Sequence, residues 1–344
     1  MLRIKPSTKV YVLCPANHQT GGTELAHQLV DRLILKKIDA FIVYVYNGNF
    51  VKADVPDGFK KYNIVVSILP DDNINNVLVF PEVSISYIDK FKNIQFLFWW
   101  MSVDNFYNFA PVIDIISFKG FFDLLSVFKI MYTRFLTNQS IMGGIGIKDL
   151  KSVCNHNLHA YQSAYAQKFL YEKNLGDVLP LGDYINSSFI EENSGIHDKQ
   201  DIILYNPAKG LGFTKKIIKA LPKFKFIALE KMSREELANH LKLAKLYIDF
   251  GNHPGKDRLP REAAVNNCCV IVGKKGSSVF FEDISIPSDY KFDKIDLSKI
   301  VNKIQFVMEN YEDCKNDFIY YRSRIFTEKE RFYKDIDDIF NMKT

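Results

Sequence analysis

The chain has 344 residues, which is long enough for two domains of ordinary size, each with its own core. Its composition is 47% hydrophobic, 14% aromatic and 25% charged, which excludes a disordered protein. A formal net charge of +5 suits anionic small ligands or an acidic membrane surface, and it is too small to predict nucleic-acid binding.

The cysteine pattern indicates a reducing compartment. The five cysteines show no metal-ligand spacing, and two of them are adjacent within an apolar strand; they are Cys14, Cys154, Cys268, Cys269 and Cys314. The N-terminal residues lead into a strand and not into a signal peptide, and no apolar run reaches the roughly 18–20 residues of a spanning helix. We therefore expect a cytoplasmic protein.

The N-terminal half alternates strands with helices. Helices are expected at 24–37 and 160–173, and a polar loop at 15–23 contains Gly21 and Gly22. Strands are expected at 10–14, 40–46, 64–69, 76–80, 94–99, 152–154 and 176–181. The strand at 94–99 leads into Trp99, Trp100 and Asp104; the tryptophans either stack on a sugar or lipid or are core residues.

The stretch 117–136 is apolar and aromatic, with Lys119, Lys129 and Arg134 set among phenylalanines and leucines. It is too polar to span a bilayer. Two interpretations remain open, namely a helix lying on an anionic inner leaflet and a core helix under the first sheet.

A polar segment at 186–200 is the best candidate for an interdomain linker, and the alternation then restarts. Strands are expected at 202–205, 224–229, 245–250 and 268–272, with helices at 214–221, from Ser233 onward and in the tail 311–340. Glu236 stands at the capping-box position relative to Ser233. Two successive βαβ series predict two Rossmann-like domains of an α/β protein that face each other across a cleft, at 1–185 and 186–320, and residues 321–344 are expected to cross back to the first domain.

The run 249–264 is the most informative part of the chain, because it packs Lys256, Asp257, Arg258, Arg261 and Glu262 into one glycine- and proline-rich connection between a strand and a helix. Such a connection at the carboxyl edge of an open sheet is typical of an anion site. Lys256 and Arg258 are candidates for a positive clamp on a diphosphate. The alternative is that Arg258, Asp257 and Arg261 form an internal ion-pair network that shapes the loop.

Four short segments together resemble the GT-B glycosyltransferases, and most closely the large retaining group (family 4) that includes glycogen-synthase-like and bacterial capsule or lipopolysaccharide transferases. They are the early Gly21–Gly22 loop, Asn206-Pro207-Ala208-Lys209-Gly210, the Arg261-Glu262-Ala263-Ala264 segment and the Gly276 turn.

The resemblance implies a role for each matching residue. Gly22 falls where the first loop approaches the donor phosphates and the acceptor, although an ordinary turn before a helix is the alternative. Lys209 matches the lysine that lies against the donor diphosphate, whereas Lys215, Lys216 and Lys219 are expected to form a solvated helix face. Glu262 matches the glutamate that holds the ribose, and Gly276 with Ser277 matches the turn around the phosphates.

The chain departs from that group at two points. The first glutamate of the Glu-x7-Glu pattern would fall at Pro254. Either His253 or Asp257 replaces it in contacting the donor sugar, or the sugar is recognised in a different way. Where many relatives carry a histidine in the first domain, this chain has Asp104, which is a candidate base or acceptor-orienting residue, or alternatively a helix N-cap. The His156 and His159 pair indicates no metal site, and the resemblance implies that no metal or other cofactor is needed.

The sequence therefore predicts a glycosyltransferase that moves a sugar from a nucleotide-diphosphate donor to a cell-surface glycan or lipid-linked glycan, with retention of configuration. The catalytic candidates are Asp104, Lys209 and Glu262; the donor-binding candidates are Gly22, Lys209, Lys256, Arg258, Glu262, Gly276 and Ser277. Two alternatives remain open, a non-catalytic GT-B subunit that binds glycan or a partner, and a nucleotide-sugar 2-epimerase.

Overall fold

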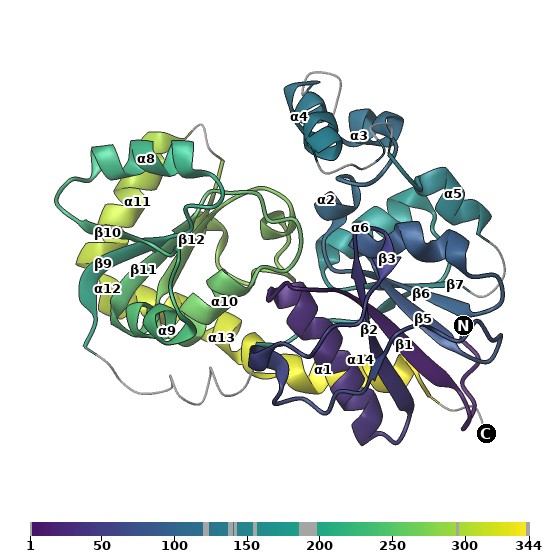
Figure 1. Cartoon of the computed structure of the whole chain (residues 1–344). Helices are drawn as coiled ribbons and strands as arrows, with labels where there is room; N and C mark the ends of the chain where they lie inside the picture. Colours follow the sequence, from purple (N-terminus) through teal and green to yellow (C-terminus); the bar gives the residue numbers. More distant parts are fainter. Residues whose placement is uncertain are drawn as a thin grey trace. The chain divides into compact units, whose positions relative to one another are not determined.

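The computed structural model describes residues 2–119, 124–136, 140, 143–153, 157–185, 198–293 and 296–341 (Figure 1). The chain forms two compact units. Unit 1 consists of Met1–Gln162, Ala166–Gly182 and Phe332–Thr344, and unit 2 consists of Ser163–Tyr165 and Asp183–Arg331.

Unit 1 is built on a sheet with the strand order β3-β2-β1-β5-β6-β7-β8, and β4 pairs with β2. The strands are β1 (Lys9–Pro15), β2 (Asp39–Tyr46), β3 (Asn49–Phe50), β4 (Val66–Ser67), β5 (Val77–Pro81), β6 (Gln95–Trp100), β7 (Asn157–Tyr161) and β8 (Val178–Pro180). The described pairings are parallel, apart from the antiparallel pair of β2 and β3. Every residue of β5 and β6 is buried, as expected for parallel strands covered on both faces.

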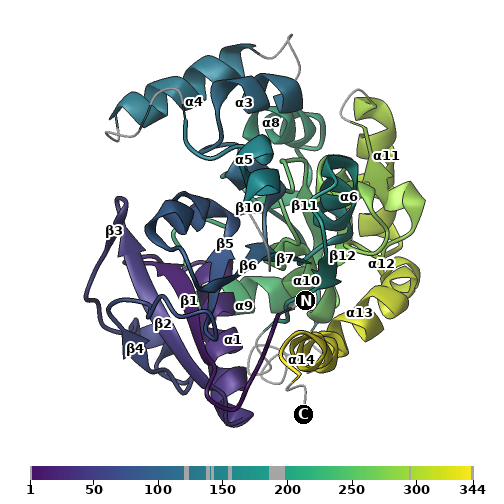
Figure 2. The ribbon, with the colours of Figure 1, turned by 90° about the vertical axis from the view of Figure 1, so that its right-hand side faces the viewer.

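The helical elements of unit 1 are α1 (Gly21–Leu35), η1 (Asp57–Phe59), η2 (Glu82–Lys90), α2 (Val103–Phe106), α3 (Val112–Lys119), α4 (Leu124–Leu136), α5 (Ile147–Ser152) and α6 (Ala164–Lys173), whose first residues group with unit 2. Helix α14 (Glu328–Ile339) begins in unit 2 and ends in unit 1. There it packs along α1 (Figures 1 and 2): the guanidinium of Arg32 lies 4.0 Å from the ring centroid of Tyr333, and Lys36 forms an ion pair with Asp337.

Unit 2 contains a second, fully parallel sheet with the order β10-β9-β11-β12-β13. Its strands are β9 (Gln200–Tyr205), β10 (Lys225–Ala228), β11 (Ala244–Asp249), β12 (Cys269–Gly273) and β13 (Lys291–Phe292). Its helical elements are α8 (Leu211–Ala220), α9 (Arg234–Leu243), α10 (Arg258–Val265), η4 (Ser277–Val279), η5 (Ser288–Tyr290), α11 (Leu297–Glu309), α12 (Tyr311–Cys314), η6 (Lys315–Phe318) and α13 (Ile319–Phe326). The core of this unit is formed by strand residues such as Leu204, Ile248 and Ile271 packed against the helices.

Three predicted boundaries in unit 1 are wrong. The strand expected at 152–154 does not begin at Ser152, because α5 extends to that residue, and the next strand in the described part of the chain is β7. Ala160 accordingly belongs to β7, and α6 starts only at Ala164. Gly21 and Gly22 lie in the first turn of α1 and not in a loop, because Thr20 and Thr23 form a capping box that starts the helix there.

Some expected features fall on residues that the structure does not describe. Cys154, His156 and residues 186–197 of the expected linker lie outside the described residues. The four described cysteines, Cys14, Cys268, Cys269 and Cys314, are buried and free, as predicted.

The stretch 117–136 forms parts of two helices, α3 and α4. The core-helix interpretation is wrong for α4, because most of its described side chains are exposed and the buried ones are Val127 and Arg134. None of the helices within the described ranges combines the length and the hydropathy that crossing a bilayer requires.

Candidate functional site

The candidate site in unit 2 begins where β11 ends. Asp249 is the last residue of β11 and is buried. Its carboxylate accepts hydrogen bonds from the hydroxyl of Tyr247 at 2.9 Å and from the backbone N–H of Gly251 at 2.8 Å. These bonds fix the Asp249 side chain at the carboxyl edge of the sheet, where parallel α/β sheets bind their ligands.

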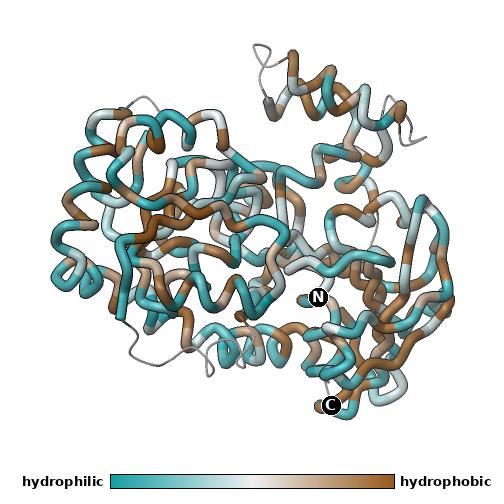
Figure 3. Tube along the Cα trace, turned by 60° about the vertical axis from the view of Figure 1, so that its left-hand side comes forward, coloured by the Kyte–Doolittle hydropathy of each residue, from teal (hydrophilic) through white to brown (hydrophobic). Residues whose placement is uncertain are grey.

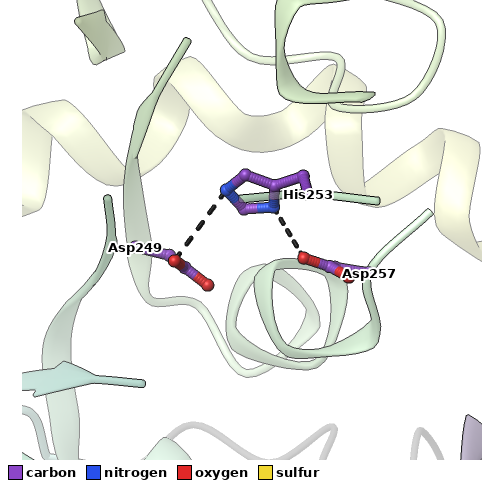
Figure 4. Close-up of side chains that lie close together, drawn as sticks. All are labelled: Asp249, His253 and Asp257. Atoms are coloured by element: carbon purple, nitrogen blue, oxygen red, sulfur yellow. Dashed lines mark ion pairs between the residues drawn. The ribbon is translucent and has the colours of Figure 1, made fainter. Parts of the chain in front are cut away.

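The imidazole of His253 lies between two carboxylates (Figure 4). Its Nδ1 is 2.7 Å from Oδ2 of Asp257, and its Nε2 is 3.9 Å from Oδ1 of Asp249. His253 is fully buried, whereas 22% of the Asp257 side chain is exposed. Burial raises the pKa of Asp257, but His253 and Lys209 outweigh that effect and hold the pKa below its ordinary value.

Lys209 reaches the same group from the loop after β9, the strand that pairs with β11. Its ammonium forms an ion pair with Asp257 and lies 3.5 Å from Oδ2 of Asp249. Gly251 makes this approach possible, because a Cβ at that position would lie 2.4 Å from Cγ of Lys209. An ammonium has three N–H donors, so two carboxylates leave one donor for an anion.

Among the residues that the structure describes, Asp249, His253 and Asp257 form the group that could hold a metal ion. One ligand-type atom from each of Asp249, His253 and Asp257 lies within 4.8 Å of the other two. The ammonium of Lys209 pairs with both carboxylates of this group. A metal ion bound here would share these two carboxylates with the ammonium of Lys209, and the expectation that no metal is needed stays a prediction.

Arg258 and Glu262 lie one turn apart on α10, and Nε of Arg258 is 3.3 Å from Oε1 of Glu262. The Glu262 side chain is 6% exposed and that of Arg258 is 22% exposed. The predicted phosphate clamp and the predicted ribose-binding carboxylate thus contact each other beside the Lys209 group.

Lys256 and Arg261 belong to a buried ion-pair network with Asp183 and Glu328. Nη1 of Arg261 is 2.9 Å from Asp183 and 2.8 Å from Glu328, and Nζ of Lys256 is 2.6 Å from Glu328. Burial raises the pKa of Asp183, but the positive charges of Arg261 and Lys256 hold it below its ordinary value. The sequence left open an internal ion-pair network of Arg258, Asp257 and Arg261, and the structure shows other partners. Arg261 pairs with Asp183 and Glu328, Asp257 pairs with Lys209, and Arg258 pairs with Glu262.

The predicted turn at Gly276 and Ser277 holds the loop of His253 in place. Gly276 has φ +64°, and a Cβ there would lie 2.1 Å from the carbonyl oxygen of His253. Ser277 donates its N–H to that carbonyl at 2.8 Å and its hydroxyl to the carbonyl of Gly255 at 2.6 Å. Ser277 is fully buried, so its side chain stabilises the loop.

In unit 1, Gly22 and Asp104 both lie near the end of β6. A Cβ at Gly22 would lie 3.5 Å from Sδ of Met101, and Asp104 is a partly exposed residue in the first turn of α2. The two tryptophans at the end of β6 are core residues: Trp99 donates to the carbonyl of Leu181 at 2.8 Å and Trp100 to Nδ1 of His159 at 3.0 Å.

Glu82, which follows β5, was missed by the sequence analysis. Its buried carboxylate accepts the backbone N–H of Met101 at 3.0 Å, and burial raises its pKa to about 7. An acidic residue directly after the apolar run 77–81 was the available signal. The partner, Met101, carries no polar side chain, so the pairing could not be read from the sequence.

Comparison with solved structures shows the class of fold. The chain is similar to sucrose-phosphate synthase from Thermosynechococcus elongatus, with a TM-score of 0.62 and 11% identity over 97% of this chain and 98% of the other. It is similar to HepE from Anabaena, crystallised with UDP and glucose, with a TM-score of 0.60 and 9% identity over 98% and 100% of the chains. A glycosyltransferase from Rickettsia africae gives a TM-score of 0.54 at 12% identity over 96% and 98%.

No protein-family model matches the chain, and no curated protein is similar to it in sequence. The likeness in structure nevertheless extends over nearly the whole of each chain. Together with the two parallel-sheet units, it confirms the predicted GT-B fold.

Proposed function

We propose that the protein is a glycosyltransferase that uses a nucleotide-diphosphate sugar as its donor. The observation that carries the proposal is the position of Lys209 beside Asp249 and Asp257, at the carboxyl edge of the unit 2 sheet in a GT-B fold. The HepE structures contain UDP and UDP-glucose, which makes UDP-sugars the first donors to test.

Lys209 is proposed to stabilise the leaving group. Departure of a nucleoside diphosphate concentrates negative charge on its terminal phosphate, and a fixed cation lowers the energy of that transition state. Asp249 and Asp257 hold the ammonium in place before the donor binds, so no reorganisation of the lysine is needed during the reaction. The remaining N–H of the ammonium is the proposed contact to the phosphate.

Glu262 and Arg258 are proposed to bind the nucleotide. A carboxylate that accepts two hydroxyl hydrogen bonds recognises a ribose, and an arginine binds a diphosphate through two parallel N–H groups. Their ion pair orients both side chains at the start of α10. The contacts of Lys256 and Ser277 are structural, so we assign them the indirect role of shaping the loop.

Asp257 is the better substitute for the glutamate that is absent at position 254. The Asp257 side chain is partly exposed, whereas His253 is fully buried and its Nδ1 contacts the Asp257 carboxylate. We therefore propose that Asp257 contacts the donor sugar and that His253 positions it.

The acceptor is proposed to be a cell-surface glycan of the capsule or lipopolysaccharide type, in lipid-linked form, with the sugar transferred with retention as in the family 4 group. Gly22 and Asp104 at the carboxyl edge of the unit 1 sheet are the proposed acceptor-side residues, with Asp104 as the orienting residue or base. The assignment of this side depends on the likeness in fold and on the sequence pattern.

A thermal-shift screen against UDP-, GDP-, CMP- and dTDP-sugars tests the donor site, with Glu262→Ala as the binding-deficient variant. A ligand at 100 times its Kd stabilises the folded state by about 2.7 kcal/mol, which raises the Tm of a domain by several degrees. Stabilisation by one nucleotide class that Glu262→Ala abolishes supports the proposal. No stabilisation by any donor overturns it.

A mass-spectrometric assay of donor consumption then separates the alternatives. Release of the nucleoside diphosphate with sugar transfer to an acceptor supports the transferase. Donor affinity without turnover identifies a non-catalytic GT-B subunit, and an isomerised sugar in the absence of acceptor identifies an epimerase.

A further inference from the structure

Helix α4 carries an exposed apolar face. The large side chains of this face have exposed fractions between 63% and 85%. They are Leu125, Phe128, Tyr132, Phe135 and Leu136. At about 100° per residue, these positions fall within an arc of roughly 100° on one side of the helix.

The opposite side of α4 holds the helix in place. Val127 and Arg134 are buried there. The guanidinium of Arg134 donates to the carbonyl of Asn108 at 2.8 Å and to that of Ala110 at 2.6 Å. The hydrogen bonds between this arginine and the loop before α3 therefore fix which face of α4 points outward.

The pattern is the reverse of an ordinary surface helix, whose apolar stripe faces the core. Helix α3, which contacts α4, adds Ile113 with 72% exposure to the apolar surface. In Figure 3, helices α3 and α4 lie at the upper right, and brown hydrophobic positions occur along both. Apolar surface of this extent on one element marks an interaction site.

The charges of α4 identify the partner as an anionic surface. The helix contains no acidic residue, and its exposed cation Lys129 lies one turn from Leu125, at the edge of the apolar face. A single helix with aromatic and leucine side chains flanked by lysine suits the headgroup region of an anionic bilayer. A symmetric contact between two copies of this face would instead bring together two Lys129 side chains, without a carboxylate on α4 to pair with them.

We propose that the α4 face binds the protein peripherally to the surface of an anionic lipid bilayer, with Phe128, Tyr132 and Phe135 in the headgroup region. This binding does not depend on the donor site in unit 2, so it can be tested independently of the proposed enzymatic function.

Flotation of the full chain with vesicles tests the proposal, using phosphatidylcholine alone and phosphatidylcholine with 30% phosphatidylglycerol. The expected result is that the unchanged protein binds the anionic vesicles and that Phe128→Glu/Phe135→Glu weakens this binding at least tenfold. Lys129→Gln should weaken binding to anionic vesicles more than binding to neutral ones. Raising the salt concentration should weaken it further, because the charge contribution is screened.

Leu35→Glu/Tyr171→Glu is the matched control, since these two side chains of unit 1 are 57% and 58% exposed on other helices. This control should bind like the unchanged protein, and all variants should keep its Tm because exposed positions are altered. Failure of the unchanged protein to float with anionic vesicles overturns the proposal. Equal loss of binding in the control variant also overturns it. A protein that binds no vesicles but forms a dimer, which Phe128→Glu/Phe135→Glu dissociates, would overturn it as well.

Discussion

Arg261 binds Asp183 through both of its terminal guanidinium nitrogens, across 78 residues of sequence, with Arg261 fully buried. The bond joins the start of α10 to the segment where the chain enters unit 2. The same guanidinium donates to the backbone carbonyls of Asp257 at 3.2 Å and of Lys256 at 3.0 Å, so the charge pair also holds the loop that carries Asp257.

Replacing this arginine should destabilise unit 2 more than any other single charge substitution in the loop 249–264. Arg261→Met leaves Asp183 and Glu328 buried without their main partner, and breaking a buried pair costs about 3–5 kcal/mol. Amide exchange of β11 and β12 measures the loss, because both tryptophans lie in unit 1 and their fluorescence does not report on unit 2. Lys256→Met is the control and should cost less, since Arg261 still holds both carboxylates; equal losses would contradict the assignment.

Glu82 should make unit 1 less stable as the pH rises. Its pKa is raised to about 7 in the folded protein, so its contribution is fully present below its ordinary value of 4.5 and is lost as the pH rises through 7. That difference corresponds to roughly 3 kcal/mol. Glu82→Gln cannot ionise, so its stability relative to the unchanged protein should increase by up to that amount between pH 4.5 and 8.

Urea unfolding followed by tryptophan fluorescence measures this effect, because Trp99 and Trp100 are buried in unit 1. A constant difference between Glu82→Gln and the unchanged protein across that pH range would show that Glu82 titrates at its ordinary pKa.

Gly276 should tolerate no side chain. Gly276→Ala places a Cβ 2.1 Å from the carbonyl oxygen of His253, at a positive φ, and should lower the free energy of unfolding by about 3 kcal/mol or more. Gly176→Ala is the control, because Gly176 also has a positive φ but open space around it, and should cost about 1–2 kcal/mol. Differential scanning calorimetry compares the two, and similar losses would mean that backbone conformation alone requires Gly276.

Lys209 should matter for turnover far more than a solvated lysine of the same unit. Lys209→Ala is expected to lower kcat by about 10²–10³, the usual cost of removing one preorganised group that stabilises developing negative charge. Lys216→Ala, an exposed position on α8, should leave kcat unchanged. Steady-state release of the nucleoside diphosphate measures both variants, and equal kcat values would exclude Lys209 from the reaction.

Local patterns were sufficient to predict most of the architecture. The apolar runs of β1, β2, β5, β6, β11 and β12 lie where the sequence placed them, as does the capping box of Ser233 and Glu236 at the start of α9. The error at 152–154 arose where the capping of α5 decides the boundary, because Asp149 accepts the backbone N–H of Gly146 and starts a helix that apolar spacing does not reveal.

The candidate site was predicted less completely, because several of its residues contact partners that are distant in sequence. The residue types in the run 249–264 were sufficient to predict an ion-rich loop at the carboxyl edge of a sheet. They could not distinguish Lys256, whose partners are Asp183 and Glu328, from Arg258, whose partner Glu262 is one helical turn away. The first pair of partners is supplied by segments that lie far from the loop in sequence.

The sequence by itself determined the two parallel sheets, the place of Asp249 at the end of a strand, and the places of Lys209 and Asp257 in connections that follow strands, because hydrophobic periodicity and turn residues are encoded locally. The tertiary structure decided which charges are buried with each other, which carboxylate is partly exposed, and which face of α4 points outward. Those outcomes depend on hydrogen bonds and ion pairs between residues distant in sequence, such as Arg134 with Ala110 and Arg261 with Asp183. Such contacts form only when the whole domain packs.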